Sequence, residues 1–342
     1  MRFSKRQLYF LFIVVTIVTL LTTLKMPYYI YKPGRADALD EIVAIESGYE
    51  SAGELYLVTV TGGQATPIQL AWSKLSPYHD VVPLKQARPD GITDDEYLES
   101  QLRLMESSQQ AAVIVAYEAA GAHITIDYEG VYVVSIVEDM PAEGYLETGD
   151  LILSVDQHEV KSADDMIDYL ATKSAGDLVN LEVVRGHTKT TKQLALKSFK
   201  NEPNKVGIGV QLVTDRKVSV DPEVNFSSGK IGGPSAGLMF ALKLYDLLTE
   251  TDLTKGYQIA GTGEIDYDGN VHSVGGVDKK VIAANRAGCD IFFVPFQKGK
   301  ENSNYDIAKK TAKKINASME IIPIDTFNEA LFYLEGLPEK AH

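Results

Sequence analysis

The chain has 342 residues, of which 45% are hydrophobic, and a formal net charge of −14. Its length and apolar fraction fit a globular protein with room for two domains and an anchor. The negative charge would repel phosphate, so nucleic acid is excluded as a partner, whereas cationic peptides would be attracted. The only cysteine, Cys289, excludes an internal disulfide and a thiolate metal cluster, and we expect it to be a small core side chain.

The first apolar segment predicts a membrane anchor. Leu8 to Leu24 contains only apolar, aromatic and threonine residues and follows Arg2, Lys5 and Arg6. About 17 residues are just enough to span a bilayer, and the positive flank stays inside. Cleavage as a signal peptide is the alternative, but the Ala36-Asp37-Ala38 site lies far beyond the apolar run. We therefore expect a single-pass protein of the cell membrane, with a cytoplasmic N-terminus and an extracellular catalytic domain.

The segment after the anchor predicts a linker and then the start of a folded domain. Residues 1–34 are assigned to a cytoplasmic tip, the anchor and a linker. The linker is expected to be non-helical because it contains prolines. Residues 35–120 are assigned to the first part of the main domain. There, alternating β-branched residues predict a strand from Gly53 to Val60, and apolar residues at helical spacing predict a long helix from Asp94 to Ala120.

The next segment has a different pattern. A glycine turn enters a strand at Tyr128–Val137, which is followed by Met140-Pro141-Ala142 and by the segment Leu146–Val155. A short helix is predicted over Ala163–Thr172 and a further strand over Leu178–Arg185. This order resembles a bacterial PDZ domain, and we assign residues 121–200 to it. A plain β-rich subdomain with an ordinary turn at Gly130 is the alternative.

The PDZ resemblance implies that this domain adds an extended peptide to its sheet, with backbone amides of the glycine loop holding a terminal carboxylate. Since Glu129 would lie beside that carboxylate, binding of an internal peptide segment stays open. The residues that match the loop and the groove-facing helix are Tyr128, Glu129, Gly130, Val131, Met166 and Leu170.

A serine follows in the segment Gly233-Pro234-Ser235-Ala236-Gly237. The proline suits the first position of a helix, which places Ser235 at a helix N-terminus. Unpaired amides and the positive end of the helix dipole can stabilise an oxyanion there. The amides of Gly233 and Ser235 are the candidate donors.

A lysine near the start of a second predicted helix, Val277–Ala287, is the candidate base. Lysine can take a serine proton only if burial or nearby positive charge disfavours its ammonium form. Lys279 lies about 100° from Lys280 around the helix axis, so both side chains cannot point at one serine. Lys280 has the closer apolar neighbours on the inward face. We therefore expect Lys280, not Lys279, to face Ser235.

Four motifs in this order resemble the proteolytic domain of Lon proteases: Gly233–Gly237, Ala260–Ile265, Val274–Gly276 and Lys280–Gly288. The resemblance implies that Ser235 is the nucleophile, that Lys280 is the base and that the Thr262 hydroxyl holds the lysine amine. Residues 201–342 are assigned to this catalytic part. Bacterial Lon proteases usually carry an acidic residue where this chain has Gly232.

Two common cofactor motifs are missing from the sequence. Gly229-Lys230 is followed by Ile231 and lacks the upstream glycine of a phosphate-binding loop, so we expect no nucleotide and no ATP-driven unfolding. There is no H-E-x-x-H motif, and His158-Glu159 stands alone. We therefore expect neither a metal nor another cofactor.

The combined pattern predicts an α+β fold: a Lon-type proteolytic domain with an inserted PDZ domain, preceded by one transmembrane helix. This arrangement resembles the PDZ-containing Lon-like serine proteases of Gram-positive bacteria, including a type that processes a secreted signalling peptide. The resemblance implies an ATP-independent endopeptidase that cleaves peptides or unfolded exported proteins, and it allows homo-oligomers.

Two other functions stay open. One is a non-catalytic, membrane-anchored PDZ adaptor with a decayed protease fold. The other is an α/β-hydrolase-like esterase, which would need an aspartate and then a histidine after the serine. His272 and His342 are the only downstream histidines, and we expect His272 to face solvent.

Overall fold

The computed structural model describes residues 4–88, 94–200, 202–203 and 205–340. The chain forms two compact units. The first unit comprises Met1–His123 and Val220–His342, and the second comprises Ile124–Ser219. The second unit is therefore an insertion within the chain of the first.

The N-terminal helix α1 runs from Lys5 to Thr23 and begins with a capping box between Ser4 and Gln7. Its side chains are exposed along its whole length. Within the described part of the chain, it is the one helix long and apolar enough to cross a membrane. Its bounds agree with the predicted anchor to within a few residues.

The predicted linker is wrong from Tyr28 onward. Tyr28–Ala38 form the strand β1, which pairs with β3 (Glu54–Gln64) on one side and with β4 (Asp80–Pro83) on the other. Tyr29 and Ile30 are buried in the unit. The prediction took the prolines as a sign of a linker. Pro33 is tolerated in the strand because it lies beside an irregularity in the β1–β3 register.

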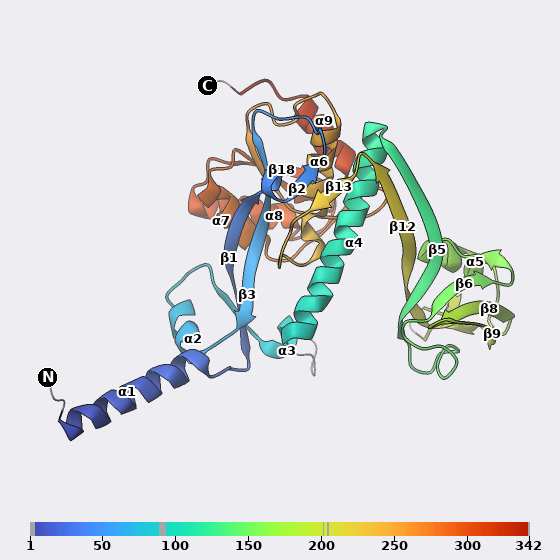
Figure 1. Ribbon diagram of the computed structural model, residues 1–342, viewed down its shortest axis with the longest axis horizontal. Helices are drawn as coiled ribbons and strands as arrows, with labels where there is room; N and C mark the ends of the chain where they lie inside the picture. Colours follow the sequence, from blue (N-terminus) through green and yellow to red (C-terminus); the bar gives the residue numbers. More distant parts are fainter. Residues whose placement is uncertain (1–3, 89–93, 201, 204, 341–342) are drawn as a thin grey trace. The chain divides into compact units, whose positions relative to one another are not determined.

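The sheet of the first unit has six strands in the order β18-β17-β14-β3-β1-β4. Figure 1 shows its strands β1 and β3 side by side. The strands β14 (Gln258–Gly261), β17 (Ile291–Pro295) and β18 (Glu320–Ile324) run parallel to β3, whereas β1 is antiparallel to it. All residues of β17 are buried, which is typical of a parallel strand covered on both faces.

Helices cover both faces of this sheet. On one face, α7 (Val277–Ala287) and α8 (Asn304–Ile315) pack with Phe292. On the other, Phe293 contacts Tyr333 of α9 (Phe327–Glu335), and α9 packs beside α6 (Gly237–Leu248). The helix α4 (Asp94–Ala120) lies against α6. The predicted bounds of α4 and α7 are confirmed.

Short elements complete the first unit. They are η1 (Leu39–Glu41), β2 (Val43–Ile45), α2 (Pro67–Ser73), α3 (Leu84–Ala87), β13 (Val224–Phe226), η2 (Pro234–Ala236), β15 (Glu264–Ile265) and β16 (Val271–His272). Cys289 is buried between α7 and β17, as expected for a core side chain.

The second unit is built on a sheet in the order β12-β5-β6-β8-β9, with β7 paired to β6. Its helix α5 begins after the cap Ser162 and ends one residue before the predicted end, because Thr172 is the C-cap. The strand predicted over Leu178–Arg185 is confirmed as β8. The elements are β5 (His123–Ile136), β6 (Leu151–Val155), β7 (His158–Glu159), α5 (Ala163–Ala171), β8 (Leu178–Arg185), β9 (Thr188–Ala195), β10 (Lys197–Ser198), β11 (Val206–Gly207) and β12 (Val210–Asp221).

Candidate active site

The serine segment is a tight turn that small residues make possible. Gly233 has a φ of 90°, a backbone conformation that favours glycine, and Pro234 then starts the short turn η2 that leads into α6. A Cβ atom on Gly237 would lie 2.7 Å from the side chains of Ile265 and Ser108. The Ser108 hydroxyl donates to the Pro234 carbonyl at 2.8 Å. Ser235 is thus held at the start of α6.

The structure brings Ser235, Lys280 and Thr262 together. Lys280 Nζ donates to Ser235 Oγ at 2.7 Å and to Thr262 Oγ1 at 2.8 Å. The Thr262 hydroxyl in turn donates to the Ser235 carbonyl at 3.0 Å. Three residues that lie far apart in the sequence therefore form one connected set of hydrogen bonds.

The Lys280 amine is buried, and its hydrogen bonds join it to two hydroxyls rather than to a carboxylate of the described residues. The residue is 4% exposed, and burial lowers the pKa of Lys280 to about 7. A large fraction of the amine is then neutral near pH 7. A neutral amine within hydrogen-bond distance of a serine hydroxyl can accept its proton.

Lys279 lies on the other side of the same helix turn and is not at the serine. Its amine pairs with Asp80 and, at 2.9 Å, with Asp278. Burial alone would lower the pKa of Lys279, but these two carboxylates outweigh burial and raise it. Of these two lysines, Lys280 contacts Ser235, whereas Lys279 contacts carboxylates.

The helix α4 closes one side of the serine turn. The Gly233 amide donates to the backbone carbonyl of Gln101 at 2.8 Å, so this predicted oxyanion donor already has an acceptor. A Cβ atom on Gly232 would lie 2.7 Å from Cβ of Gln101. The acidic side chain usual at this position in bacterial Lon proteases would therefore collide with α4.

Ser235 and Lys280 lie in a cleft of about 890 Å³. The cleft is bordered by β1, β3, α4 and the start of α7, and its charged lining includes Arg35, Asp37 and Lys230. One carboxylate oxygen of Asp37 is buried with no hydrogen-bond partner. The cleft carries groups of both charges.

The second unit has a separate groove of about 720 Å³. The predicted residues Met166 and Leu170 line it from α5. Its other wall is formed by residues 205–212, which include β11 and the start of β12. A groove between a helix and a strand edge suits an added peptide strand.

The predicted glycine loop does not border this groove. Tyr128 and Glu129 line a different hollow, and Val131 is buried in the core, where it pairs with Ile152 across β5 and β6. A Cβ atom on Gly130 would lie 2.5 Å from the Ile152 carbonyl oxygen. Gly130 therefore permits close strand contact, and the prediction that Tyr128–Val131 form the groove's loop is wrong.

Sequence reasoning missed the segment that does form the wall. Gly207-Ile208-Gly209-Val210 alternates glycine with apolar residues, and Gly209 has a φ of 80°. Since a Cβ atom on Gly209 would lie 2.1 Å from Cβ of Met140, only glycine fits there. This alternation was the signal, but it stands after the last strand of the predicted domain.

Comparisons with known proteins find two matching families. Residues 158–334 match the family described as the Lon protease (S16) C-terminal proteolytic domain, and residues 102–196 match the PDZ domain family. The two matches overlap at 158–196, a stretch that belongs to the second unit.

The curated relatives are Lon proteases. That of Aster yellows witches'-broom phytoplasma (strain AYWB) is 30% identical over 158 residues, 46% of this chain and 19% of the relative. That of Trichlorobacter lovleyi is 37% identical over 107 residues, 31% of this chain and 12% of the relative. The chain thus spans about a fifth or less of the length of these relatives. Among solved structures, the PDZ domain of an SdrC-like protein from Listeria monocytogenes has 36% identity and a TM-score of 0.25, and covers 26% of this chain and 93% of that one.

Proposed function

Because the chain belongs to the family of the Lon (S16) proteolytic domain and also carries a PDZ domain, we propose that it is a membrane-anchored serine endopeptidase with a Ser235–Lys280 dyad. The observation that carries this proposal is the hydrogen bond of 2.7 Å between Ser235 Oγ and a buried lysine amine. An adaptor that needs no chemistry has no reason to keep a lysine in so costly a position.

In the proposed mechanism, Ser235 Oγ attacks the peptide carbonyl carbon while its proton moves to the neutral Lys280 amine. The resulting ammonium then protonates the leaving amine as the C–N bond breaks, which leaves an acyl-enzyme and a neutral lysine. A water molecule next gives a proton to Lys280 and attacks the acyl carbon. Return of that proton to Ser235 Oγ releases the carboxylic acid product.

The backbone around Ser235 supplies the proposed stabilisation of the oxyanion. The Ser235 amide, at the start of the turn into α6, is one donor. The Gly233 amide can be the second donor only when its bond to the Gln101 carbonyl is broken. We therefore propose that substrate binding moves the first turns of α4 away from the serine turn.

The PDZ groove is the proposed recruitment site, and the substrates are peptides or unfolded proteins. The net charge of −14 favours cationic ones. The basic residues Arg2, Lys5 and Arg6 at the start of the chain support a cytoplasmic N-terminus, with both units outside the cell. We propose that the substrates include a secreted signalling peptide, as the resemblance to PDZ-containing Lon-like proteases of Gram-positive bacteria implies.

Mass spectrometry of candidate exported peptides, incubated with the full chain in detergent, tests the activity. We expect new termini to accumulate with wild type and not with Ser235→Ala, and we expect neither EDTA nor ATP to change the rate. Equal cleavage by Ser235→Ala would overturn the assignment.

A pair of surface substitutions tests the PDZ groove. Ile167 lines the groove and is 45% exposed, whereas Leu178 lies on β8 and is 60% exposed. Ile167→Asp should raise the KM for a recruited peptide by several-fold and leave hydrolysis of a short generic peptide unchanged, because remote binding energy is lost. Leu178→Asp is the matched control. Equal kinetics of the two variants on the recruited peptide would exclude recruitment by this groove.

A further inference from the structure

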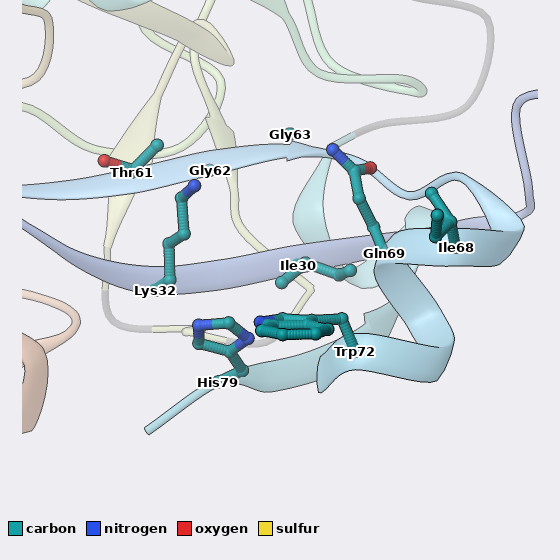
Figure 2. A pocket seen from close by; sticks show the side chains of 9 residues that line it. All are labelled: Ile30, Lys32, Thr61, Gly62, Gly63, Ile68, Gln69, Trp72 and His79. Atoms are coloured by element: carbon teal, nitrogen blue, oxygen red, sulfur yellow. The ribbon is translucent and has the colours of Figure 1, made fainter. Parts of the chain in front are cut away.

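The short helix α2 presents an unusual group of exposed apolar side chains. Trp72 is 67% exposed, Ile68 is 49% exposed and Leu75, just beyond the helix, is 78% exposed. Beside them is a pocket of about 370 Å³. Figure 2 shows Trp72 and His79 on one side of β1, with Ile30 and Lys32 on that strand. We call Ile68, Trp72 and Leu75 the α2 apolar patch.

The chain fixes this patch next to the end of the membrane-spanning helix. The Met26 amide donates to the Ala65 carbonyl at 2.8 Å, and Gln64 Nε2 donates to the Met26 carbonyl at 3.0 Å. Met26 is three residues beyond the end of α1 at Thr23, which is at most about 10 Å of extended chain. The helices α1 and α2 are also in contact. The patch therefore lies on the part of the unit that is next to the end of α1.

The charge around the patch is opposite to that of the whole chain. The chain has 47 acidic residues in 342, yet residues 24–36 and 64–79 contain none. Lys25, Lys32 and Lys74 are exposed in these segments. Lysines beside exposed tryptophan and leucine are the composition of a surface that lies in the interface of an anionic membrane.

We propose that the α2 apolar patch inserts into the headgroup region of the membrane that α1 spans. This inference rests on α1 crossing the membrane and does not depend on peptidase activity. Insertion of the patch would also set the position of the cleft, because β1 links the two. This strand carries Ile30 and Lys32 at the pocket and Tyr31 and Arg35 at the cleft. Seating of α2 would hold the cleft at a fixed, short distance from the bilayer, where it reaches segments close to the membrane surface.

Fluorescence can test this directly, because Trp72 is the only tryptophan in the chain. The full chain is reconstituted into vesicles of phosphatidylcholine and phosphatidylglycerol, with or without lipids brominated near the headgroup end of the acyl chain. We expect the brominated lipids to quench Trp72 emission several-fold and the vesicles to protect it from acrylamide. Leu75→Asp together with Ile68→Asp should reduce both effects.

A relocated tryptophan provides the control. Phe332 on α9 is 80% exposed, and α9 ends beside Lys255, whose amine contacts the Glu335 carbonyl. That region adjoins the Glu54 end of β3, a strand of 11 residues and about 36 Å whose other end holds α2 (Figure 1). Trp72→Phe combined with Phe332→Trp should be quenched by acrylamide and not by brominated lipid.

Two results would overturn the proposal. Emission from Trp72 that acrylamide quenches fully and brominated lipid does not would place the patch in water. Protection from both quenchers would mean that a protein surface, such as a second copy of the chain, covers it. Each result is independent of whether Ser235 and Lys280 hydrolyse peptides.

Discussion

Two regions of the first unit each bury a lysine, with opposite results. Lys280 is 4% exposed and Lys243, in the middle of α6, is 2% exposed. The Lys243 amine pairs with Asp40 and, at 3.4 Å, with Asp246. Burial alone would lower the pKa of Lys243, but these carboxylates outweigh burial and raise it. The Lys280 amine meets two hydroxyls instead, and burial lowers its pKa to about 7.

The difference shows that burial by itself does not determine what a lysine does. Around Lys243, the charge is neutralised and joined to further polar groups, since Asp246 also accepts hydrogen bonds from Ser51 Oγ and the Leu253 amide. That cluster ties α6 to the residues before β3. Around Lys280, the desolvation of the ammonium is left uncompensated, so the neutral amine is favoured and can act as a base. One substitution, lysine to methionine, distinguishes the two cases.

The largest expected effect is on activity at Lys280. Lys280→Met removes the base and should reduce kcat/KM on the order of 10³-fold or more, and a double variant with Ser235→Ala should lose little further, because the two residues act as a unit. Lys279→Met, at the preceding residue, is the matched control, and it should retain activity within a few-fold. Equal losses in the two variants would contradict the assignment of Lys280 as the base. Rates on a cleavable peptide measure both.

Lys243→Met should mainly affect stability. The substitution leaves Asp246, which is 1% exposed, buried without its cation, and loss of one partner of a buried pair costs about 3–5 kcal/mol. Chemical denaturation of the full chain in detergent measures the change. Asp40→Asn is the milder control, since the Asp40 side chain is 55% exposed. Activity per folded molecule should be unchanged in both variants, and a stable Lys243→Met protein would show that the cluster contributes no net stability.

Lys280→Met should change stability in the other direction. The pKa of Lys280 is about 7 in the folded state and 10.5 as the usual value, so the unfolded chain binds more protons between these pH values. Folding stability therefore rises with pH from about 7 to 10.5, and the full penalty is present below pH 7. At pH 7 the methionine variant should be more stable than wild type and should lack this slope. Loss of stability at every pH would mean that the lysine is not desolvated.

Much of this site could be predicted because its information is local. The turn at Gly233–Gly237 and the helix Val277–Ala287 depend on spacing along the chain, and the latter begins and ends at the predicted residues. The helix also fixes which of two neighbouring lysines faces inward. By contrast, one of the two partners of Lys279 is Asp80, 199 residues away, and no local pattern indicates that pairing.

The PDZ groove could be predicted less well from the sequence than the serine and lysine site. A glycine that begins a strand looks the same in sequence whether it forms a binding loop or allows two strands to approach closely. Gly130 has the second role, because the carbonyl of Ile152 leaves no room for a Cβ atom. This contact is visible only in the three-dimensional structure. The true wall of the groove, residues 205–212, lies after the last strand that the prediction assigned to the domain.

The smallest expected effect concerns the hydroxyl beside the base. Thr262 is fully buried, accepts from Lys280 Nζ and donates to the Ser235 carbonyl. Thr262→Val removes the contact that orients the amine, and it should reduce kcat roughly 10- to 100-fold with little change in KM. The Ser235 carbonyl keeps the Gly263 amide as a donor, at 2.9 Å, so the fold should survive.

In wild type the rate should rise with pH through about 7, as Lys280 loses its proton. Since the hydroxyl accepts from the ammonium form, its loss should move this midpoint to lower pH. Thr262→Ser should restore both the rate and the midpoint, whereas a valine variant with the wild-type pH profile would mean that Thr262 acts only in packing.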